Sequence, residues 1–332
     1  MRTATPWFIL VVISAAIICG VLGPGATDEP TAADRRRAKR LAEQIEKLRP
    51  LHKKLGKPRP GDWRAGPGAD EPGQTFAEYL RCRPVRPVGT RRVIYVQPLG
   101  GFTGTQRKIV DLSAEFMGMY FNLPVKVLKP LPASVIPKRA RRVHPTWGVQ
   151  QILSTYVLDD VLAPRLPKDA AAYIAFTASD LWPGAGWNFV FGQASLRGRV
   201  GVWSIYRNGD PAAGRRAFRL CLLRTLKTAT HETGHMFSMR HCTAYECNVC
   251  GSNHLEESDR RPLSLCPECL GKVCWATRTE PLARFQKLLT FAGRHGFATE
   301  AGIYARSIKA LGGKVPPGTT KKGSRRPGRP AR

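Results

Sequence analysis

The sequence predicts an α/β (α+β) fold in which a mixed sheet carries helices on both faces. Residues 93–96 form a compact β-rich apolar run closed by Pro98 and Gly100, which is typical of a buried strand. Residues 171–181 and 199–207 have the same character. Because segments with helical periodicity separate these runs, we expect a sheet whose strands alternate with helices.

Three segments between and after these strands are predicted helices. Residues 109–121 and 148–162 have helical apolar spacing. The clearest helix covers residues 215–237, where apolar side chains recur at intervals of mostly three and four: Phe218, Cys221, Leu222, Leu226 and Ala229. With 332 residues and a 42% apolar composition, the chain can build a normal core.

Residues 1–26 are typical of a signal peptide or an N-terminal anchor. Arg2 precedes an uncharged apolar run at residues 7–23, which is a signal-peptide layout. An uncleaved anchor is the alternative, although the run is slightly short for the roughly 20 residues that span a bilayer. The third interpretation is a cytosolic protein whose N-terminal segment only resembles a signal peptide. We expect a protein that is exported, to the periplasm or the extracellular space, or anchored to a membrane by this segment.

Composition divides the rest of the chain into three parts. Residues 27–75 contain a charged stretch and then a Pro/Gly-rich linker. Apolar side chains recur at helical spacing in the charged stretch: Leu41, Ile45 and Leu48. The plain interpretation is a surface helix leading to a linker, and a partner-binding arm is the alternative. Residues 76–312 have the composition of a folded domain, and residues 313–332 are predicted to be a disordered basic tail.

The formal net charge of +29 makes attraction to nucleic acid, anionic membranes or acidic polymers physically available. The basic residues are spread over the surface and both flanks rather than gathered in a nucleic-acid-binding motif. We therefore expect no specific nucleic-acid partner. The oligomeric state does not follow from the sequence.

The helix predicted over residues 215–237 carries a metal-binding motif, HETGH, near its end. Residues four apart lie on one helix face, so His231 and His235 can direct imidazole nitrogens at one metal ion. Glu232 follows directly and can reach a water molecule held by that ion. In this HExxH arrangement zinc lowers the pKa of its bound water towards roughly 7, and the carboxylate is the general base as the water attacks.

A third ligand is required, because catalytic zinc sites usually have three protein ligands and one open position. His241 follows His235 by six residues. A continuing helix would point His241 away, so we expect the helix to end within residues 236–239 and the chain to turn back. HExxH alone arises by chance on many helices. The third histidine and a nearby cysteine cluster favour a true metal site.

A second, structural zinc site is predicted directly after His241. Its four candidate ligands form two pairs, the second a CPEC knuckle: Cys242, Cys247, Cys266 and Cys269. Four thiolates fit a closed tetrahedral zinc site that stabilises folding. Disulfide pairing is the alternative in an exported protein. Cys250 and Cys274 lie nearby, and both a disulfide and competition for the metal are open to them. The sequence does not decide between these roles.

These residues resemble the archaemetzincins, a family of zinc metallopeptidase-like proteins in the metzincin clan. The family pattern is HExxH, a third histidine followed at once by cysteine, a second cysteine five residues on and a downstream CxxC, and this chain has every element. The likeness covers residues 91–310. It implies a zinc-dependent metallopeptidase that hydrolyses peptide bonds in a peptide or protein substrate, with one catalytic and one structural zinc.

The resemblance also implies a metzincin-like twisted mixed sheet, a cleft with the catalytic zinc on its floor and a zinc-stapled C-terminal part. We expect the substrate to lie extended along an edge strand within residues 187–194. Tyr206 and Tyr245 are candidate donors to an oxyanion. Glu256 and Glu257 are candidate acceptors from a zinc-bound histidine, and ordinary structural or solvated roles remain open for all four. The alternative function is a non-catalytic two-zinc protein of the same fold with an anionic partner.

Two positions depart from the family pattern. Ser238 stands where the family has glycine in the turn towards the third ligand. A left-handed backbone costs a non-glycine residue about 1 to 2 kcal/mol, so we expect either a different turn or one held in place by its surroundings. Val249 stands where the family has methionine beneath the metal. Neither change removes a ligand or the general base.

Overall fold

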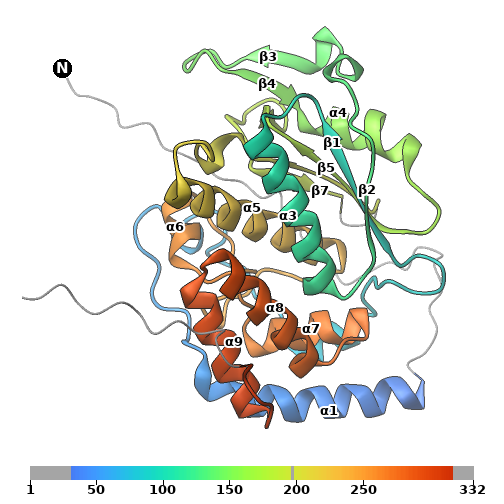
Figure 1. Cartoon of the computed structure of the whole chain (residues 1–332), viewed down its shortest axis with the longest axis vertical. Coiled ribbons are helices and arrows are strands. Elements are labelled where there is room, and N and C mark those ends of the chain that lie inside the picture. The colour runs from blue at the N-terminus through green and yellow to red at the C-terminus, as the bar shows by residue number, and fades with distance from the viewer. Residues whose placement is uncertain (1–30, 196–197, 317–332) are drawn as a thin grey trace, which may run out of the picture.

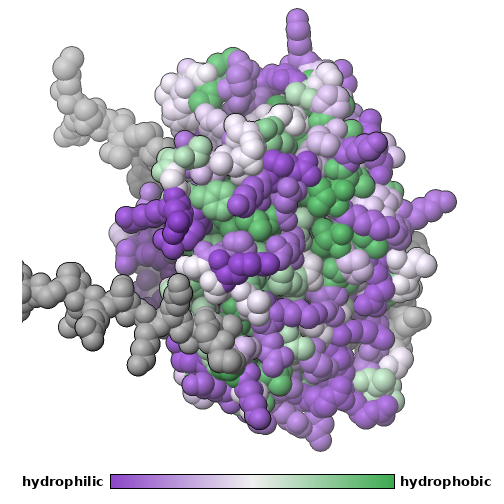
Figure 2. All heavy atoms as spheres, in the orientation of Figure 1, coloured by the Kyte–Doolittle hydropathy of each residue, from purple (hydrophilic) through white to green (hydrophobic). Residues whose placement is uncertain are grey.

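The computed structural model describes residues 31–195 and 198–316 (Figure 1). The signal peptide or anchor expected at residues 1–26 lies outside these ranges, as does the basic tail from residue 317 onward. None of the helices in the described ranges has the length and apolar character needed to cross a membrane. The face seen in Figure 2 is mostly hydrophilic, with apolar patches between the polar side chains.

A mixed sheet of five strands forms the centre of the described part of the chain. Its strands are, in spatial order, β2 (Val125–Val127), β1 (Val93–Leu99), β5 (Ala170–Thr177), β8 (Val200–Ser204) and β7 (Gly192–Ala194). The first four pair in parallel, whereas β7 pairs antiparallel with β8 and lies at the edge. The predicted mixed sheet is confirmed. The three predicted strand runs overlap β1, β5 and β8, although β1 extends past residue 96 and β5 begins at Ala170.

Alternation of side chains along the strands explains why both faces of the sheet are covered. In β5, Ile174 belongs to the main core, which it shares with α3 (Gly104–Phe121) and α5 (Arg215–Met236). Its neighbour Tyr173 belongs to a second apolar cluster on the opposite face. Helical turns at residues 154–165 cover that second face.

The prediction of a helix over residues 148–162 is wrong for the first part of that segment. That part is strand β4 (Gln150–Leu153), which pairs antiparallel with β3 (Arg141–Val143) and parallel with β6 (Asp180–Trp182). Only from Ser154 onward is the backbone helical. Pairing with strands outside the segment decides its conformation, since apolar spacing alone does not distinguish a short buried strand from a helix.

The C-terminal part is helical and packs beside the sheet (Figure 1). Its helices are α6 (Leu255–Arg260), α7 (Pro267–Thr277), α8 (Pro281–His295) and α9 (Ala298–Ala310). The short helix α2 (Phe76–Arg81) packs on α7, and α8 packs on both α9 and α3. The sheet and the C-terminal helices therefore share the main core.

The charged N-terminal helix belongs to the same core. α1 (Ala32–Leu48) packs along α7, at the bottom of the view in Figure 1. The expected helix is present, and its apolar residues Leu41, Ile45 and Leu48 are all buried in the main core. Most of its polar residues are exposed, but Asp34 is buried and Arg37 donates to the carbonyls of Cys274 and Thr279. The helix as a whole is therefore fixed to the C-terminal helices.

Leu48→Ala is expected to lower the free energy of unfolding by about 2 to 5 kcal/mol, because removing a fully buried side chain leaves a cavity. Leu51→Ala is the matched control, because Leu51 is 37% exposed, and it should have a much smaller effect. Urea unfolding of both variants measures the difference. Equally small losses would contradict the packing of α1 into the core.

Candidate metal centres

The C-terminal end of α5 presents two histidines on one buried face. The ring centroids of His231 and His235 are 4.7 Å apart, and their Nε2 atoms are 3.0 Å apart. Zinc with Zn–N bonds of about 2.0 to 2.1 Å holds two nitrogens about 3.3 Å apart. The spacing of the two nitrogens is therefore close to that required by one shared ion.

The chain turns back after α5 and brings His241 to this pair. The helix ends at Met236, within the predicted interval. The ring centroid of His241 lies 5.2 Å from that of His231 and 4.8 Å from that of His235. The candidate ligand atoms of all three histidines lie within 4.8 Å of one another. The structure thus brings together the three histidines selected from the sequence.

Ser238 adopts the left-handed conformation that the turn requires, with a φ of +64°. Its backbone N–H donates to the carbonyl of His235 at 2.8 Å. Its Oγ accepts a hydrogen bond from the backbone N–H of Val85 at 2.9 Å. The chain thus keeps the turn despite the missing glycine, and the segment after α2 supports it.

Each imidazole donates its Nδ1 proton to a fixed acceptor. His231 donates to the carbonyl of Asn248 at 2.8 Å, and His235 donates to the carbonyl of Met239 at 2.6 Å. His241 donates to the carboxylate of Glu71 at 2.9 Å. Because these acceptors carry no proton, all three Nε2 atoms keep a lone pair. Three lone pairs that converge in a buried space suit a cation such as zinc.

Burial keeps the imidazoles of His231 and His235 neutral, as metal binding requires. It lowers the pKa of His235 to about 3 and holds the pKa of His231 well below its usual range. The prediction that Glu256 and Glu257 accept hydrogen bonds from these histidines is wrong. Glu257 accepts the backbone N–H of Trp63 instead, and Glu256 pairs with His254.

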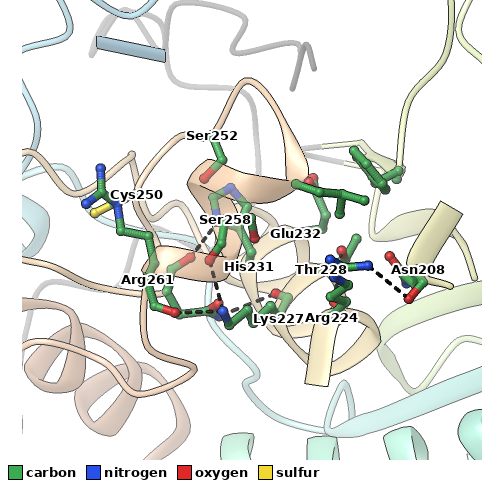
Figure 3. A pocket seen from close by; sticks show the side chains of 14 residues that line it. Asn208, Arg224, Lys227, Thr228, His231, Glu232, Cys250, Ser252, Ser258 and Arg261 are labelled. Atoms are coloured by element: carbon green, nitrogen blue, oxygen red, sulfur yellow. Dashed lines mark hydrogen bonds between the residues drawn. The ribbon is translucent and has the colours of Figure 1, made fainter. Parts of the chain in front are cut away.

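Glu232 lies beside the histidines and is also buried. Figure 3 shows Glu232 and His231 in the wall of one cavity, whose empty volume is about 620 Å³ including the part open to solvent. The cavity is also lined by basic and apolar residues, among them Arg224, Lys227, Arg261, Phe191 and Leu255. Burial raises the pKa of Glu232 to about 8. The fold therefore places this carboxyl group on the cavity that His231 also lines.

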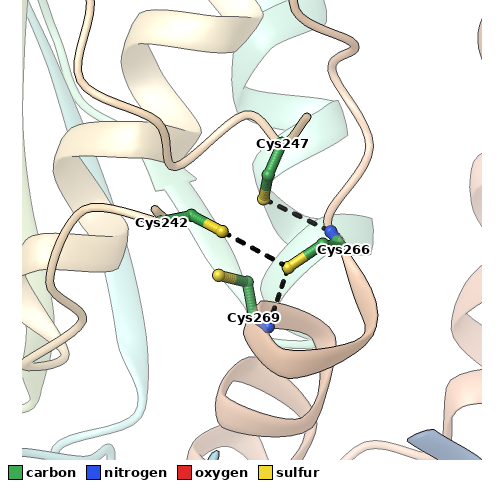
Figure 4. Close-up of side chains that lie close together, drawn as sticks. All are labelled: Cys242, Cys247, Cys266 and Cys269. Atoms are coloured by element: carbon green, nitrogen blue, oxygen red, sulfur yellow. Dashed lines mark hydrogen bonds between the residues drawn. The ribbon is translucent and has the colours of Figure 1, made fainter. Parts of the chain in front are cut away.

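The four selected cysteines converge on a second buried point, shown in Figure 4. Their Sγ atoms lie within 4.8 Å of one another, and those of Cys242 and Cys266 are 3.6 Å apart. Zinc with Zn–S bonds of about 2.3 Å holds two sulfurs about 3.8 Å apart. All four cysteines are free thiols. The geometry favours metal binding over the disulfide alternative.

Backbone N–H groups already point at these sulfurs. The N–H groups of Val249 and Cys266 lie 3.5 and 3.3 Å from Sγ of Cys247, and that of Cys269 lies 3.5 Å from Sγ of Cys266. Such donors stabilise thiolates. Burial nevertheless raises the pKa of Cys266 well above its usual range. Four adjacent thiolates therefore require a bound cation to compensate their charge.

A short loop connects the two centres. The carbonyl of Asn248 accepts the His231 proton, and the carbonyl of Val249 accepts the N–H of Cys242 at 2.9 Å. The Val249 side chain is buried in the main core. The valine thus preserves an apolar contact in this loop, and the loop links the cysteine cluster to a histidine ligand.

Other residues selected from the sequence lie elsewhere. Cys250 and Cys274 are buried free thiols, and the Cys250 thiol donates to the carbonyl of Tyr245. The Tyr245 hydroxyl contacts Arg49 rather than the histidines, and Tyr206 is 45% exposed. A third group of possible metal ligands, Asp62, His254 and Glu257, was not selected from the sequence. Its two carboxylates are already bound by arginines and backbone N–H groups.

Two residues that contact the histidine cluster come from the stretch predicted as a linker. Glu71 accepts the His241 proton, and the Trp63 ring packs edge-on against the His241 ring at a centroid distance of 5.5 Å. No metal-binding pattern marks Glu71. A tryptophan inside a Pro/Gly-rich stretch is the one signal that this stretch packs against the fold.

Comparison with known proteins gives similarities of three kinds. The profile of Peptidase family M54 matches residues 166–274. Archaemetzincin-2 of Macaca fascicularis is 34% identical over 262 residues, which cover 69% of this chain and 71% of that protein. The crystal structure of archaemetzincin from Archaeoglobus fulgidus, complexed with malonate, has 30% sequence identity and a TM-score of 0.43, and the match covers 54% of this chain and 99% of that chain.

Ser238→Ala is expected to be less stable than both wild type and Ser238→Gly. Alanine keeps the strain of the left-handed backbone and loses the hydrogen bond from Val85, a loss of about 1 kcal/mol. Glycine loses the same bond but relieves strain of about 1 to 2 kcal/mol. Urea midpoints of the three proteins test the order. An alanine variant at least as stable as the glycine variant would show that the turn is not strained.

Proposed function

This chain belongs to the archaemetzincin family of zinc-dependent metallopeptidases, and from that premise we propose that it hydrolyses peptide bonds with Glu232 as the general base. The premise agrees with the resemblance seen in the motifs of the sequence. The observation that carries the proposal is the buried cluster of three histidines, together with the cavity that both His231 and Glu232 line.

The histidines and the cysteines would hold two zinc ions. His231, His235 and His241 would bind the catalytic ion, and the four clustered cysteines would bind the structural ion. A catalytic zinc supplies Lewis acidity and lowers the pKa of a bound water towards roughly 7. Three protein ligands support the catalytic assignment, since such sites keep one open position. Four thiolates support the structural assignment, because they close the coordination sphere.

Glu232 carries out the proton transfers in this proposal. Its side chain lies on the cavity that His231 also lines. The carboxylate accepts a proton from the attacking water, and the carboxylic acid then donates it to the amide nitrogen that leaves.

The edge strand β7 is the proposed binding site for an extended peptide. Gly192 belongs to β7, and both Phe191 and Gly192 line the cavity beside Glu232. β7 is the last strand of the sheet and pairs with β8 on its inner side. An added peptide strand would place its backbone along the cavity, as in other cases of strand addition. This arrangement supports a peptide or protein substrate.

Glu232→Gln is expected to reduce hydrolysis of a diverse peptide library by about 100-fold or more, because the amide cannot accept the proton. The variant should keep its metal, since Glu232 is not among the clustered ligands. Glu256→Gln is the matched control, because that side chain is 79% exposed. Mass spectrometry of the products and elemental analysis provide the two readouts. Unchanged hydrolysis by Glu232→Gln would refute this mechanism.

Metal analysis tests the two-zinc assignment directly. Wild type should contain two zinc ions per chain, and His241→Ala and Cys269→Ala should each retain about one, because each substitution removes a ligand from only one tetrahedral site. Inductively coupled plasma mass spectrometry after dialysis gives the counts. One zinc in wild type, or no change in either variant, would contradict two separate centres.

A further inference from the structure

Residues 59–75, here called the N-terminal strap, lie across the loop that carries His241. Gln74 contacts this loop twice: its Oε1 accepts the backbone N–H of Arg240 at 3.2 Å, and its Nε2 donates to the carbonyl of Ser238 at 3.5 Å. Lys272 of α7 donates to the backbone carbonyl of Gln74. The strap is therefore attached both to the loop and to the C-terminal helices.

Trp63 anchors the middle of the strap. Its side chain is 3% exposed, and its backbone N–H donates to the buried carboxylate of Glu257 at 2.9 Å. Two glycines leave room for its indole ring. A Cβ atom would lie 1.9 Å from the ring at Gly68 and 2.3 Å from it at Gly251. Because any larger residue at either position would collide with the ring, the position of Trp63 is tightly fixed.

Glu71 connects this anchor to the third histidine. Its carboxylate accepts the indole Nε1–H of Trp63 at 2.9 Å and the Nδ1–H of His241 at 2.9 Å. The Trp63 ring meets the His241 ring at an interplanar angle of 75°, so it also limits rotation of the imidazole. His231 and His235 donate to backbone carbonyls instead. Among the three histidines, His241 is the one these contacts pair with a carboxylate.

We propose that Glu71, held by Trp63, is a positioning residue that fixes the tautomer and the orientation of His241 for metal binding. The inference rests on the proposed function of the histidine cluster. A carboxylate that accepts the outer proton of a ligand histidine strengthens metal binding, and its loss typically costs 10- to 100-fold in metal affinity. The strap lies outside the region matched by the family profile, residues 166–274, and Glu71 is 170 residues away from His241 in the sequence.

The environment of Glu71 makes a direct test feasible. Its side chain is 22% exposed, so a smaller residue at this position leaves no cavity in the core. Glu71→Gln keeps the size of the side chain and a hydrogen-bond acceptor but removes the charge. Glu71→Ala removes both. Asp70→Asn is the matched control, because Asp70 is the exposed acidic neighbour in the strap.

The experiment measures zinc affinity by competition with a chelator, in full-length protein, for wild type and the three variants. Removal of the carboxylate should weaken one zinc about 100-fold in Glu71→Ala and about 10-fold in Glu71→Gln. The other zinc should be unchanged in every protein, as should both zincs in Asp70→Asn. With Co²⁺ in place of zinc, the visible absorption bands of the weakened site should shift in Glu71→Ala, because the His241 ring changes orientation when it loses its acceptor.

Urea midpoints of the metal-free proteins separate positioning from stability. A variant whose midpoint equals that of wild type while its zinc affinity falls supports the proposal. Wild-type zinc affinity and an unchanged Co²⁺ spectrum in both Glu71→Ala and Glu71→Gln would overturn it. This result is distinct from failure of the proposed function, because it concerns metal affinity and requires no peptide hydrolysis.

Discussion

The rest of the site depends on one constraint: the Nδ1–H of each of three histidines is donated to a fixed acceptor. Each proton is donated to an acceptor that the fold holds in place, namely the carbonyls of Asn248 and Met239 and the carboxylate of Glu71. The three Nε2 lone pairs therefore face one small buried volume. Lone pairs this close repel one another. A bound cation would remove this repulsion, because each lone pair would then bind the cation.

The fold supplies these acceptors from separate segments. Met239 belongs to the turn that Ser238 makes possible, Asn248 belongs to the loop attached to the cysteine cluster, and Glu71 belongs to the N-terminal strap. Loss of order in any of them would misdirect one imidazole. The cysteine cluster fixes the loop that holds Asn248, so metal bound by the thiols would also stabilise the histidine cluster. The sheet adds an edge strand beside the resulting cavity.

The sequence predicts the clustering of the candidate ligands better than it predicts their supports. His231 and His235 follow from helical spacing, and the end of α5 at Met236 follows from the need to return His241 to the other two histidines. The strand at residues 150–153 was missed, because local apolar spacing does not reveal partners that are distant in sequence. Glu71 was missed for the same reason. Its partner is 170 residues away, and a Pro/Gly-rich composition is typical of a linker.

Anomalous diffraction from crystals grown with zinc, measured on both sides of the zinc absorption edge, tests the central claim most directly. We expect one peak about 2.0 to 2.1 Å from Nε2 of His231, His235 and His241, and a second peak about 2.3 Å from the four clustered sulfurs. The Nδ1 of His241 should remain hydrogen bonded to Glu71 in that structure. A histidine cluster without a peak, or one that binds zinc through Nδ1, would contradict the account.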